Sequence, residues 1–472
     1  MIRNGKKKAI SCALVAAMSV GLAACGTTSY DFKVSYDGIK TGDVSSKVSV
    51  HDPSILKADG EYYIFGSHMS AAKSSDLLNW EKVADGYSKK NPVYGQIYDV
   101  ADEAFAYSGS KNSLIKTDDK QVHVWAPDVI YNETTGLYYM YYCTTSTWNA
   151  SNLCYGTSTT PEGPYEWQGA LIYSGFNRKT ISGTDVLDYV DEDYAYKNYI
   201  KGAQYNYEDY PNAIDPTVFY DADGRMWMVY GSWSGGIFLL EIDKTTGLVI
   251  HPEADKANNV DPYYGKRLLG GGHISIEGPY IMYDETSGYY YLFVSYGALT
   301  SNGGYQVRVF RSKTVDGEYV DMNGKYPEKS AQHQNFGLKL TGNYKLPSLE
   351  KAYMATGHNS AFVDDDGRMY LVYHTRFNDN GEGHSPRVHQ MLVNEDGWPC
   401  ELPYQTQGET VNKDGYDADD IIGRYYVINQ GTAIDSKIAN PVILYLEKNG
   451  KVKGEKSEGT WECKDGSYYM NI

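Results

Sequence analysis

The chain has little cysteine and no excess of basic residues, and both shortages exclude classes of protein. Only six cysteines occur in 472 residues, too few for a fold held together by disulfides. Asp and Glu number 60 against 43 Lys and Arg, so the net charge is −17. Nucleic acid requires a basic face, and we therefore expect no nucleic-acid partner. A neutral polymer or a small ligand remains as the ligand class.

Long helical repeats are also absent. No long segment carries apolar residues at the helical period, and no second hydrophobic run of membrane length follows the N-terminal one. Instead, runs rich in Tyr, Val, Ile and Phe are bounded by turn residues such as Asp, Gly, Asn and Thr. The sequence therefore predicts an all-β protein.

The first 24 residues have the pattern of a secretory signal. Basic residues precede the apolar stretch Ala9–Ala24, which is too short to span a bilayer comfortably. The stretch ends in Leu-Ala-Ala before Cys25, which resembles a bacterial lipobox. We predict a signal peptide over 1–24, lipidation at Cys25 and a tether over 25–45. The mature protein would be a bacterial cell-surface lipoprotein, extracellular and held to the membrane only by its lipid. The alternative is an ordinary signal peptide with an incidental cysteine.

One β-hairpin pattern recurs five times along the chain. Each copy has a polar or acidic residue, a short apolar run, a turn and a second run rich in Tyr. The copies begin at His51, Trp125, Ile214, Glu277 and His358. Five such units with unequal insertions predict a five-bladed β-propeller over 46–405. An unrelated β-sandwich is the alternative, and it would require all five copies to agree by accident.

Three further segments lie outside the repeated hairpins. Insertions cover about 85–121 and 175–211, and the second is dense in Tyr and Asp. Long loops on a rigid scaffold usually carry function, although solvated decoration is the alternative. Residues 415–472 predict a small separate β domain.

Three carboxylates from different repeats are predicted to meet. The first strand of each propeller blade lines the central channel, so equivalent residues of the five copies converge. Aligning the copies gives a first column with Glu277 and His358 and a second column with Asp52, Asp215 and Asn359. Neither column contains a Lys or Arg that would neutralise the carboxylates.

This carboxylate set suits glycoside hydrolysis, which needs one protonated acid and one ionised base or nucleophile. Carboxylates gathered in a narrow channel raise one another's pKa, which favours protonation of one of them. A channel that only binds a cation to stabilise the ring is the alternative.

His358 is a candidate metal ligand because its column places it beside the acidic cluster. Calcium prefers oxygen ligands, which counts somewhat against an imidazole. The Asp-rich turns at 221–224 and 364–367 lack the remainder of an EF-hand loop, so we predict hairpin turns there.

The four cysteines beyond the anchor leave the disulfide state open. Cys143 and Cys154 would form a disulfide if they faced each other on paired strands, and two buried thiols are equally consistent with the sequence. Cys400 and Cys463 show no pairing pattern either.

The motifs around these residues resemble glycoside hydrolase family 43, and the resemblance covers about 45 to 400. The motifs that carry it are Asp52-Pro53-Ser54-Ile55, Trp125-Ala126-Pro127-Asp128, Ala213-Ile214-Asp215-Pro216 and Ile276-Glu277-Gly278-Pro279. Within the family, Gly231-Ser232-Trp233-Ser234-Gly235-Gly236 and Gly357-His358-Asn359-Ser360 are similar to the arabinanases.

The resemblance implies roles for the matching residues. Asp52 would be the general base that activates water, Glu277 the general acid, and Asp215 the group that modulates the pKa and orientation of the acid. His358 would hold a central ion, usually calcium, that is otherwise surrounded largely by water. The residues that would border the sugar subsites are Trp125, Asn212, Ala213, Ile214, Ser232, Trp233 and Ser234.

The implied activity is inverting hydrolysis of internal α-1,5 linkages of arabinan by a monomer. An exo-acting arabinofuranosidase or β-xylosidase of the same fold is the nearest rival. A non-catalytic surface protein that captures glycans is the rival from another class. The 47 tyrosines would suit stacking on sugars in either case, but a pure binder has no need of three carboxylates.

The tail resembles the small β-barrel that follows the propeller in two-domain extracellular arabinanases. Ile422-Gly423-Arg424-Tyr425-Tyr426 and Gly459-Thr460-Trp461 carry this resemblance. The sequence stops within a strand-like run, so we expect either a shortened domain or a fragment.

Overall fold

The structure is a computed structural model of the chain. It describes residues 14–16, 29–37, 46–118, 121–146, 149–327, 332–379, 381–464 and 467–472. Cys25, most of the predicted signal peptide over 1–24 and much of the predicted tether lie outside these residues, so those assignments stay predictions.

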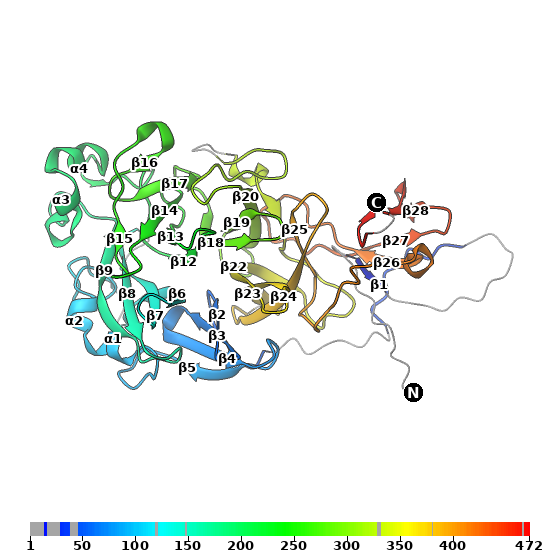
Figure 1. Cartoon of the computed structure of the whole chain (residues 1–472), viewed down its shortest axis with the longest axis horizontal. Helices are drawn as coiled ribbons and strands as arrows, with labels where there is room; N and C mark the ends of the chain where they lie inside the picture. The colour runs from blue at the N-terminus through cyan, green and yellow to red at the C-terminus, as the bar shows by residue number, and fades with distance from the viewer. Residues whose placement is uncertain are drawn as a thin grey trace.

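Five antiparallel sheets follow one another along the chain (Figure 1). The first comprises β2 (Ser54–Ala58), β3 (Glu61–Gly66), β4 (Ser70–Ser74) and β5 (Glu81–Ala84). The second comprises β6 (Val124–Asn132), β7 (Leu137–Thr145), β8 (Ser151–Ser158) and β9 (Glu166–Tyr173). The third comprises β12 (Thr217–Tyr220), β13 (Met226–Tyr230), β14 (Ile237–Ile242) and β17 (Gly265–Leu269), with the short β15 (Val249–Ile250) and β16 (Val260–Asp261).

The fourth and fifth sheets have the same order of strands. The fourth comprises β18 (Ile276–Asp284), β19 (Tyr289–Tyr296), β20 (Gln306–Ser312) and β21 (Leu338–Lys339). The fifth comprises β22 (Tyr353–Val363), β23 (Met369–Phe377), β24 (Ser385–Val393) and β25 (Pro399–Glu401).

The five sheets close into a ring around a central axis. Their first strands contact one another in the cyclic order β2, β6, β12, β18, β22 and back to β2. These strands lie nearest the centre of the ring in Figure 1, and the last strands lie at its rim. The five hairpins found in the sequence are the first two strands of the five sheets. The prediction of an all-β propeller is confirmed, and the described sheets in the ring number five.

Turn chemistry explains how the hairpins close. Asp59 and Gly60 both have positive φ, as a two-residue type I′ turn requires. In the third sheet the Asp221 carboxylate accepts hydrogen bonds from the backbone N–H groups of Asp223 and Arg225. Asp364 begins the corresponding turn, where its carbonyl accepts a bond from Gly367. Both Asp-rich segments are therefore hairpin turns, as predicted.

Tyrosine side chains make up much of the packed core of the propeller. Tyr94, Tyr141, Tyr142, Tyr165, Tyr199, Tyr230, Tyr263, Tyr264, Tyr291 and Tyr296 are among the largest fully buried side chains. Most of their hydroxyls find internal partners, as when Tyr199 donates to Asp261 Oδ1 at 2.8 Å. Much of the Tyr abundance therefore serves packing, and stacking on sugars is not needed to explain it.

The two insertions form short elements on the flank of the ring. The first contains α1 (Gly95–Asp99) and α2 (Ala101–Ala104). The second contains η2 (Ile181–Gly183), α3 (Val186–Tyr189), α4 (Glu192–Asn198), β10 (Ile200–Lys201) and β11 (Gln204–Tyr205). Three other single 3-10 turns are η1 (Ser67–Met69), η3 (Lys256–Asn258) and η4 (His333–Asn335).

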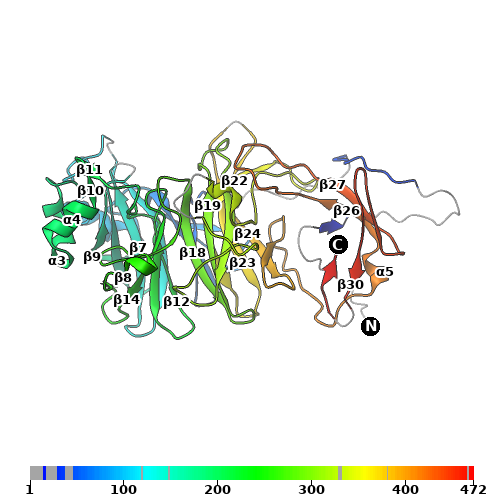
Figure 2. The same cartoon turned by 90° about the horizontal axis from the view of Figure 1, so that it is seen from above.

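A smaller β domain forms a separate lobe beside the ring (Figures 1 and 2). It contains α5 (Ala418–Ile421), β26 (Gly423–Val427), β27 (Val442–Leu446), β28 (Lys451–Gly454), β29 (Glu458–Thr460), β30 (Glu462–Cys463) and β31 (Met470–Asn471). β1 (Leu14–Ala16), within the predicted signal peptide, pairs with the edge of β26. The segment between β26 and β27 reaches back to the fourth sheet, where Gln306 Nε2 donates to the Ala433 carbonyl at 3.0 Å.

Cys143 and Cys154 are buried free thiols, and Cys463 is also free. The strand register explains why the first two do not pair, because Cys143 lies opposite Leu153 and Cys154 lies opposite Tyr142. Of the two alternatives for this pair, the structure has the buried thiols.

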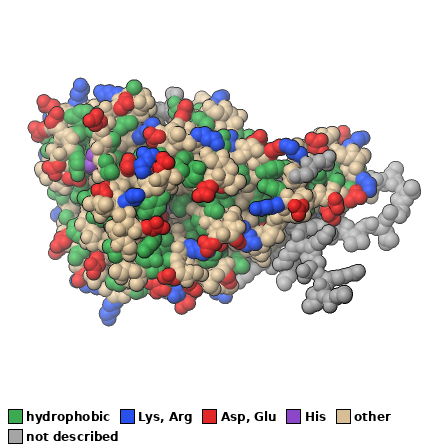
Figure 3. Space-filling view, viewed as in Figure 1, with side chains coloured by type: hydrophobic (Ala, Val, Ile, Leu, Met, Phe, Trp, Pro, Cys, Tyr) green, Lys and Arg blue, Asp and Glu red, His purple; other side chains and the backbone are tan. Residues whose placement is uncertain are grey.

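The surface carries charges of both signs, and the helices are short. Figure 3 shows Asp and Glu side chains scattered among Lys, Arg and apolar groups over the face viewed, without a basic patch. Among the described residues, no helix is both long and apolar enough to cross a bilayer.

The Asp128 carboxylate connects three blades near the axis. It lies on β6 in the second blade, accepts a hydrogen bond from the Ser54 hydroxyl of β2, and accepts another from the Val218 N–H of β12 at 2.7 Å. Burial raises the pKa of Asp128 to about 7, although both donors favour the ionised form. Ser54 and Val218 follow Asp52 and Asp215 closely in sequence, so this contact sets the spacing of those two carboxylates.

Candidate active site

A left-handed backbone kink occurs within or just before the first strand of every blade. The kinked residues are Asp52, Ala126, Asp215, Gly278 and His358, with φ of 54°, 40°, 56°, 56° and 47°. In three blades the register of the hairpin shifts at this point, which is a β-bulge. A bulge re-aims the side chains beside it, and here it directs them into the channel.

The position predicted for His358 relative to the other repeats is wrong by one residue. The columns predicted from the sequence put His358 beside Glu277 and put Asn359 beside Asp52 and Asp215. The structure places His358 itself at the kink, equivalent to Asp52 and Asp215. The fifth repeat was misaligned by one residue because it lacks the proline that follows the kink in the other four.

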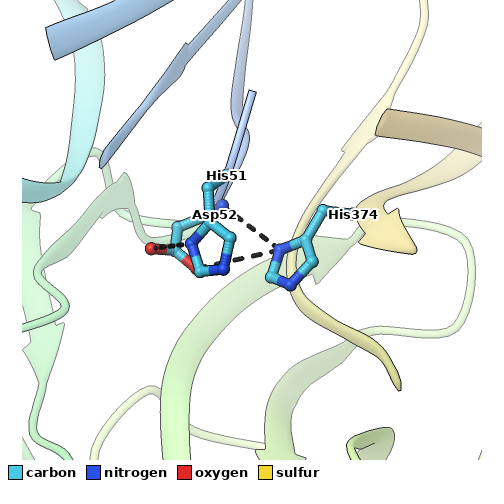
Figure 4. A group of neighbouring side chains, drawn as sticks. All are labelled: His51, Asp52 and His374. Atoms are coloured by element: carbon cyan, nitrogen blue, oxygen red, sulfur yellow. Dashed lines mark hydrogen bonds and ion pairs between the residues drawn. The ribbon is translucent and has the colours of Figure 1, made fainter. Parts of the chain in front are cut away.

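Asp52 has four neighbouring side chains as partners, two of which, His51 and His374, are drawn in Figure 4. Its Oδ2 accepts a hydrogen bond from the Ser67 hydroxyl at 2.5 Å and lies 2.7 Å from His51 Nδ1. Its Oδ1 lies 3.1 Å from His358 Nδ1. Its backbone N–H donates to His374 Nδ1 at 3.2 Å, which holds the kink in place. The carboxylate is therefore fixed in orientation as well as in position.

These contacts favour the ionised form of Asp52. Burial alone would raise its pKa, but the imidazole rings of His358 and His51 hold the pKa well below its usual range. The ring of His374 stacks on that of His51 with centroids 4.1 Å apart. Burial and the neighbouring His51 lower the pKa of His374 well below its usual range, so this ring is neutral.

Glu277 has neutral hydrogen-bond donors instead of imidazoles as its closest partners. Its Oε2 accepts bonds from the Ser232 hydroxyl at 3.0 Å and from the Trp233 indole N–H at 2.7 Å. Tyr305 also shares a hydrogen bond with this carboxyl group. Glu277 lies on β18, so the third and fourth blades build its surroundings together.

Burial raises the pKa of Glu277, partly opposed by the hydrogen bond of Tyr305. Burial also raises the pKa of Asp215 well above its usual range, assisted by the charges of Glu277 and Asp52. The sequence predicted a raised pKa for Glu277, and this direction is found. The main cause differs, because burial dominates and the repulsion acts strongly at Asp215.

A cavity of about 420 Å³ opens beside Glu277. Its lining includes Trp125, Asn212, Ile214, Ser232 and Trp233 of the predicted sugar-binding residues. Ala213 and Ser234 are fully buried and are not among its lining residues. Residues 175–211, all of them described, contribute nothing to the lining either. A second cavity, of about 600 Å³, is lined by inner-strand residues and contains none of the three carboxylates.

The side chains around Asp52 can also hold a cation. His358 turns Nδ1 toward Asp52, which leaves Nε2 as its lone-pair donor, and this carboxylate–imidazole arrangement is usual for metal-ligating histidines. His51, Asp52 and His374 also bring ligand atoms within 4.8 Å of one another. However, His374 Nδ1 already accepts the Asp52 N–H, so His358 is the better placed ligand.

Comparison with known proteins identifies the family. Residues 44–209 and 191–399 match Glycosyl hydrolases family 43, and residues 403–472 match the C-terminal lipocalin-like domain that accompanies it. The chain belongs to glycoside hydrolase family 43. It is therefore a glycoside hydrolase by family, and the family resemblance noted in the sequence is confirmed.

Relatives within family 43 extend over nearly the whole chain. The extracellular endo-α-(1→5)-L-arabinanase of Thermotoga petrophila is 39% identical over 90% of this chain and 84% of that protein. The extracellular endo-α-(1→5)-L-arabinanase 2 of Bacillus subtilis is 37% identical over 89% of this chain and 83% of that protein. An extracellular exo-α-(1→5)-L-arabinofuranosidase of Cellvibrio japonicus is 27% identical over 75% of this chain and 87% of that protein.

Solved structures of family 43 support the same fold. The crystal structure of the Thermotoga petrophila endo-1,5-α-L-arabinanase in complex with Tris has a TM-score of 0.75 at 39% identity. It covers 88% of this chain and 87% of that chain.

Several residues that build this family 43 site were missed in the sequence. His374 lies in the second strand of its hairpin and Ser67 directly follows one, whereas the site was predicted from the first strands alone; Tyr305 directly precedes a third strand. His123 and His273 also line the cavity, but no motif or repeat in the sequence marks them.

The kink geometry predicts opposite outcomes for two small substitutions. A Cβ added at Gly278 would lie 3.1 Å from two ring atoms of His358, at a φ of +56°. Gly278→Ala should therefore displace His358, lower activity, and reduce the free energy of unfolding by about 1–3 kcal/mol. The matched control is Ala126→Gly, at the equivalent kink.

Ala126→Gly should change the free energy of unfolding by less than about 1 kcal/mol, since relief of strain offsets the more flexible unfolded chain. Urea unfolding and rate measurements on both variants provide the check. Equal stability losses in the two variants would show that the kinks carry no strain and that the Gly278 contact with His358 is unimportant.

Proposed function

We propose that the protein is an endo-acting, inverting hydrolase of α-1,5-linked arabinan. The observation that carries this proposal is the contrast between two carboxyl groups in one channel. The surroundings of Asp52 favour the ionised form, whereas those of Glu277 favour the protonated form. Two carboxyl groups with pKa values moved apart in this way are the acid and base of glycoside hydrolysis. The relatives named as endo-arabinanases support the choice of substrate.

In the proposed mechanism Asp52 removes a proton from a water molecule as the oxygen of that water attacks the anomeric carbon. Glu277 donates its proton to the glycosidic oxygen as the bond to the leaving sugar breaks. Asp52 ends protonated and Glu277 ionised, and exchange with solvent restores both. Asp215, which accepts a bond from the Gly278 N–H at 3.2 Å, positions the backbone beside Glu277, and repulsion between the two carboxyl groups disfavours their simultaneous ionisation.

A calcium ion at His358 is also part of the proposal. His358 would supply its Nε2, and water would supply most of the oxygen ligands that calcium prefers. Such an ion would contribute positive charge among three carboxyl groups. The sequence-derived assignment of His358 as the ligand thus has a geometric basis in its contact with Asp52.

We also propose that the protein acts outside the cell, attached through a lipid at Cys25. Its relatives of this length are called extracellular, and the leader resembles a lipobox. A monomer that meets polymeric arabinan at the cell surface is consistent with an endo-acting enzyme.

Substitution of the two carboxyl groups tests the proposed roles. Asp52→Asn should reduce release of reducing sugar from debranched arabinan by at least about 10³-fold, because no group then activates water. Glu277→Gln should lose about 10²–10⁴-fold on arabinan and much less on substrates with very good leaving groups. Asp223→Asn, in an exposed hairpin turn, is the control and should retain activity. Full activity in Asp52→Asn would contradict the assignment of the base.

Chelation tests the cation. Dialysis of the protein against a chelator should lower its activity and melting temperature, and added calcium should restore both, because a ligand of the folded state stabilises it. In His358→Ala, calcium should no longer raise the melting temperature. A wild-type melting temperature and activity that do not respond to chelation would contradict the calcium proposal.

A further inference from the structure

Two hydrogen bonds end on the same oxygen atom of Glu277. The Ser232 hydroxyl and the Trp233 indole N–H both reach Oε2, at 3.0 and 2.7 Å. A carboxyl oxygen has two lone pairs, so these two donors occupy the accepting capacity of Oε2. A proton on Oε2 would occupy one of these two lone pairs, and although the Ser232 hydroxyl can turn to accept it, the indole N–H can only donate. Both bonds to Oε2 are kept only when the proton of a neutral Glu277 is on Oε1.

The indole is held in place by the backbone rather than by packing alone. The N–H of Trp233 donates to the carbonyl of Ile276 at 2.9 Å, and the carbonyl of Trp233 accepts from the N–H of Ile274 at 3.2 Å. Trp233 has a φ of 55°, a strained conformation for a bulky residue. Its loop is thus bonded to the residue immediately before Glu277, so indole and carboxyl group move together.

From this geometry we propose that Trp233 is a positioning residue that selects which oxygen of Glu277 carries the transferable proton. This inference rests on the proposed role of Glu277 as the general acid. Trp233 also lines the 420 Å³ cavity with Glu277, so the same side chain contacts the space for the sugar and orients the acid beside it. Ser232 shares the task through its hydroxyl group.

The chain offers a matched control in the same cavity. Trp125 also lines the cavity, but within the described part of the chain its indole N–H has no hydrogen-bond partner. Trp233→Phe and Trp125→Phe each remove an indole N–H and retain an aromatic ring. Only Trp233→Phe removes a donor from Glu277. The two backbone bonds of residue 233 remain in the Phe variant.

The experiment compares leaving groups. Rates are measured on aryl α-1,5-arabino-oligosaccharides whose phenols range from weakly to strongly acidic, since only poor leaving groups need the proton of the acid. Trp233→Phe should lower kcat about 10- to 100-fold for the weakly acidic phenols and less than about threefold for the most acidic. Trp125→Phe should change all the substrates by one common factor.

A double substitution separates positioning from structural damage. In a Glu277→Gln background no carboxyl proton exists, so adding Trp233→Phe should cause no further loss that depends on the leaving group. Retained activity on the most acidic phenols shows that the Trp233→Phe protein is folded. A uniform loss over all phenols in Trp233→Phe, or an unchanged dependence on the leaving group, would overturn the positioning role.

Failure of the proposed function gives a different result. If Glu277 is not the acid, the loss of rate caused by Glu277→Gln would be the same for all the leaving groups. If Glu277→Gln shows that dependence and Trp233→Phe does not, only the inference about Trp233 is wrong.

Discussion

A left-handed kink, repeated in all five blades, is the constraint on which the site depends. Four of the five kinked residues have a side chain, and each such conformation costs on the order of 1–3 kcal/mol. The closed ring of inner strands and bonds such as that from Asp52 to His374 hold the kinks in place. In return, the kinks direct Asp52, Asp215 and His358 into one channel and hold Gly278 against the His358 ring.

The carboxyl groups of Asp52 and Glu277 have pKa values moved in opposite directions because side chains from different blades surround them. Asp52 lies among imidazoles supplied by the first and fifth blades, which favour the carboxylate. Glu277 has a different environment. It is buried, and the neutral donors Ser232 and Trp233 bond to its carboxyl group. A channel of carboxyl groups thereby contains one whose surroundings favour the ionised form and one whose surroundings favour the protonated form.

The repeat pattern was sufficient to predict the hairpins, the propeller and the convergence of the three carboxylates. It was not sufficient for His358, because the fifth repeat has Asn359 where the others have proline, and the alignment slipped by one residue. Ser67 and His374 lie at the second strands of their hairpins and Tyr305 just before a third strand, and their contacts with the carboxyl groups arise only when the blades assemble. Ala213 and Ser234 are adjacent in sequence to residues that line the cavity, but local sequence does not reveal which residues of a segment are fully buried.

The central claim is that ionised Asp52 activates water while protonated Glu277 releases the sugar in a single displacement. Early-time proton NMR of α-1,5-arabinan hydrolysis tests it most directly, because the anomer formed first records the side from which the new oxygen arrives. Single displacement inverts the α linkage, so the β anomer of the new reducing end should form first. Initial formation of the α anomer would contradict the account and would indicate a covalent intermediate.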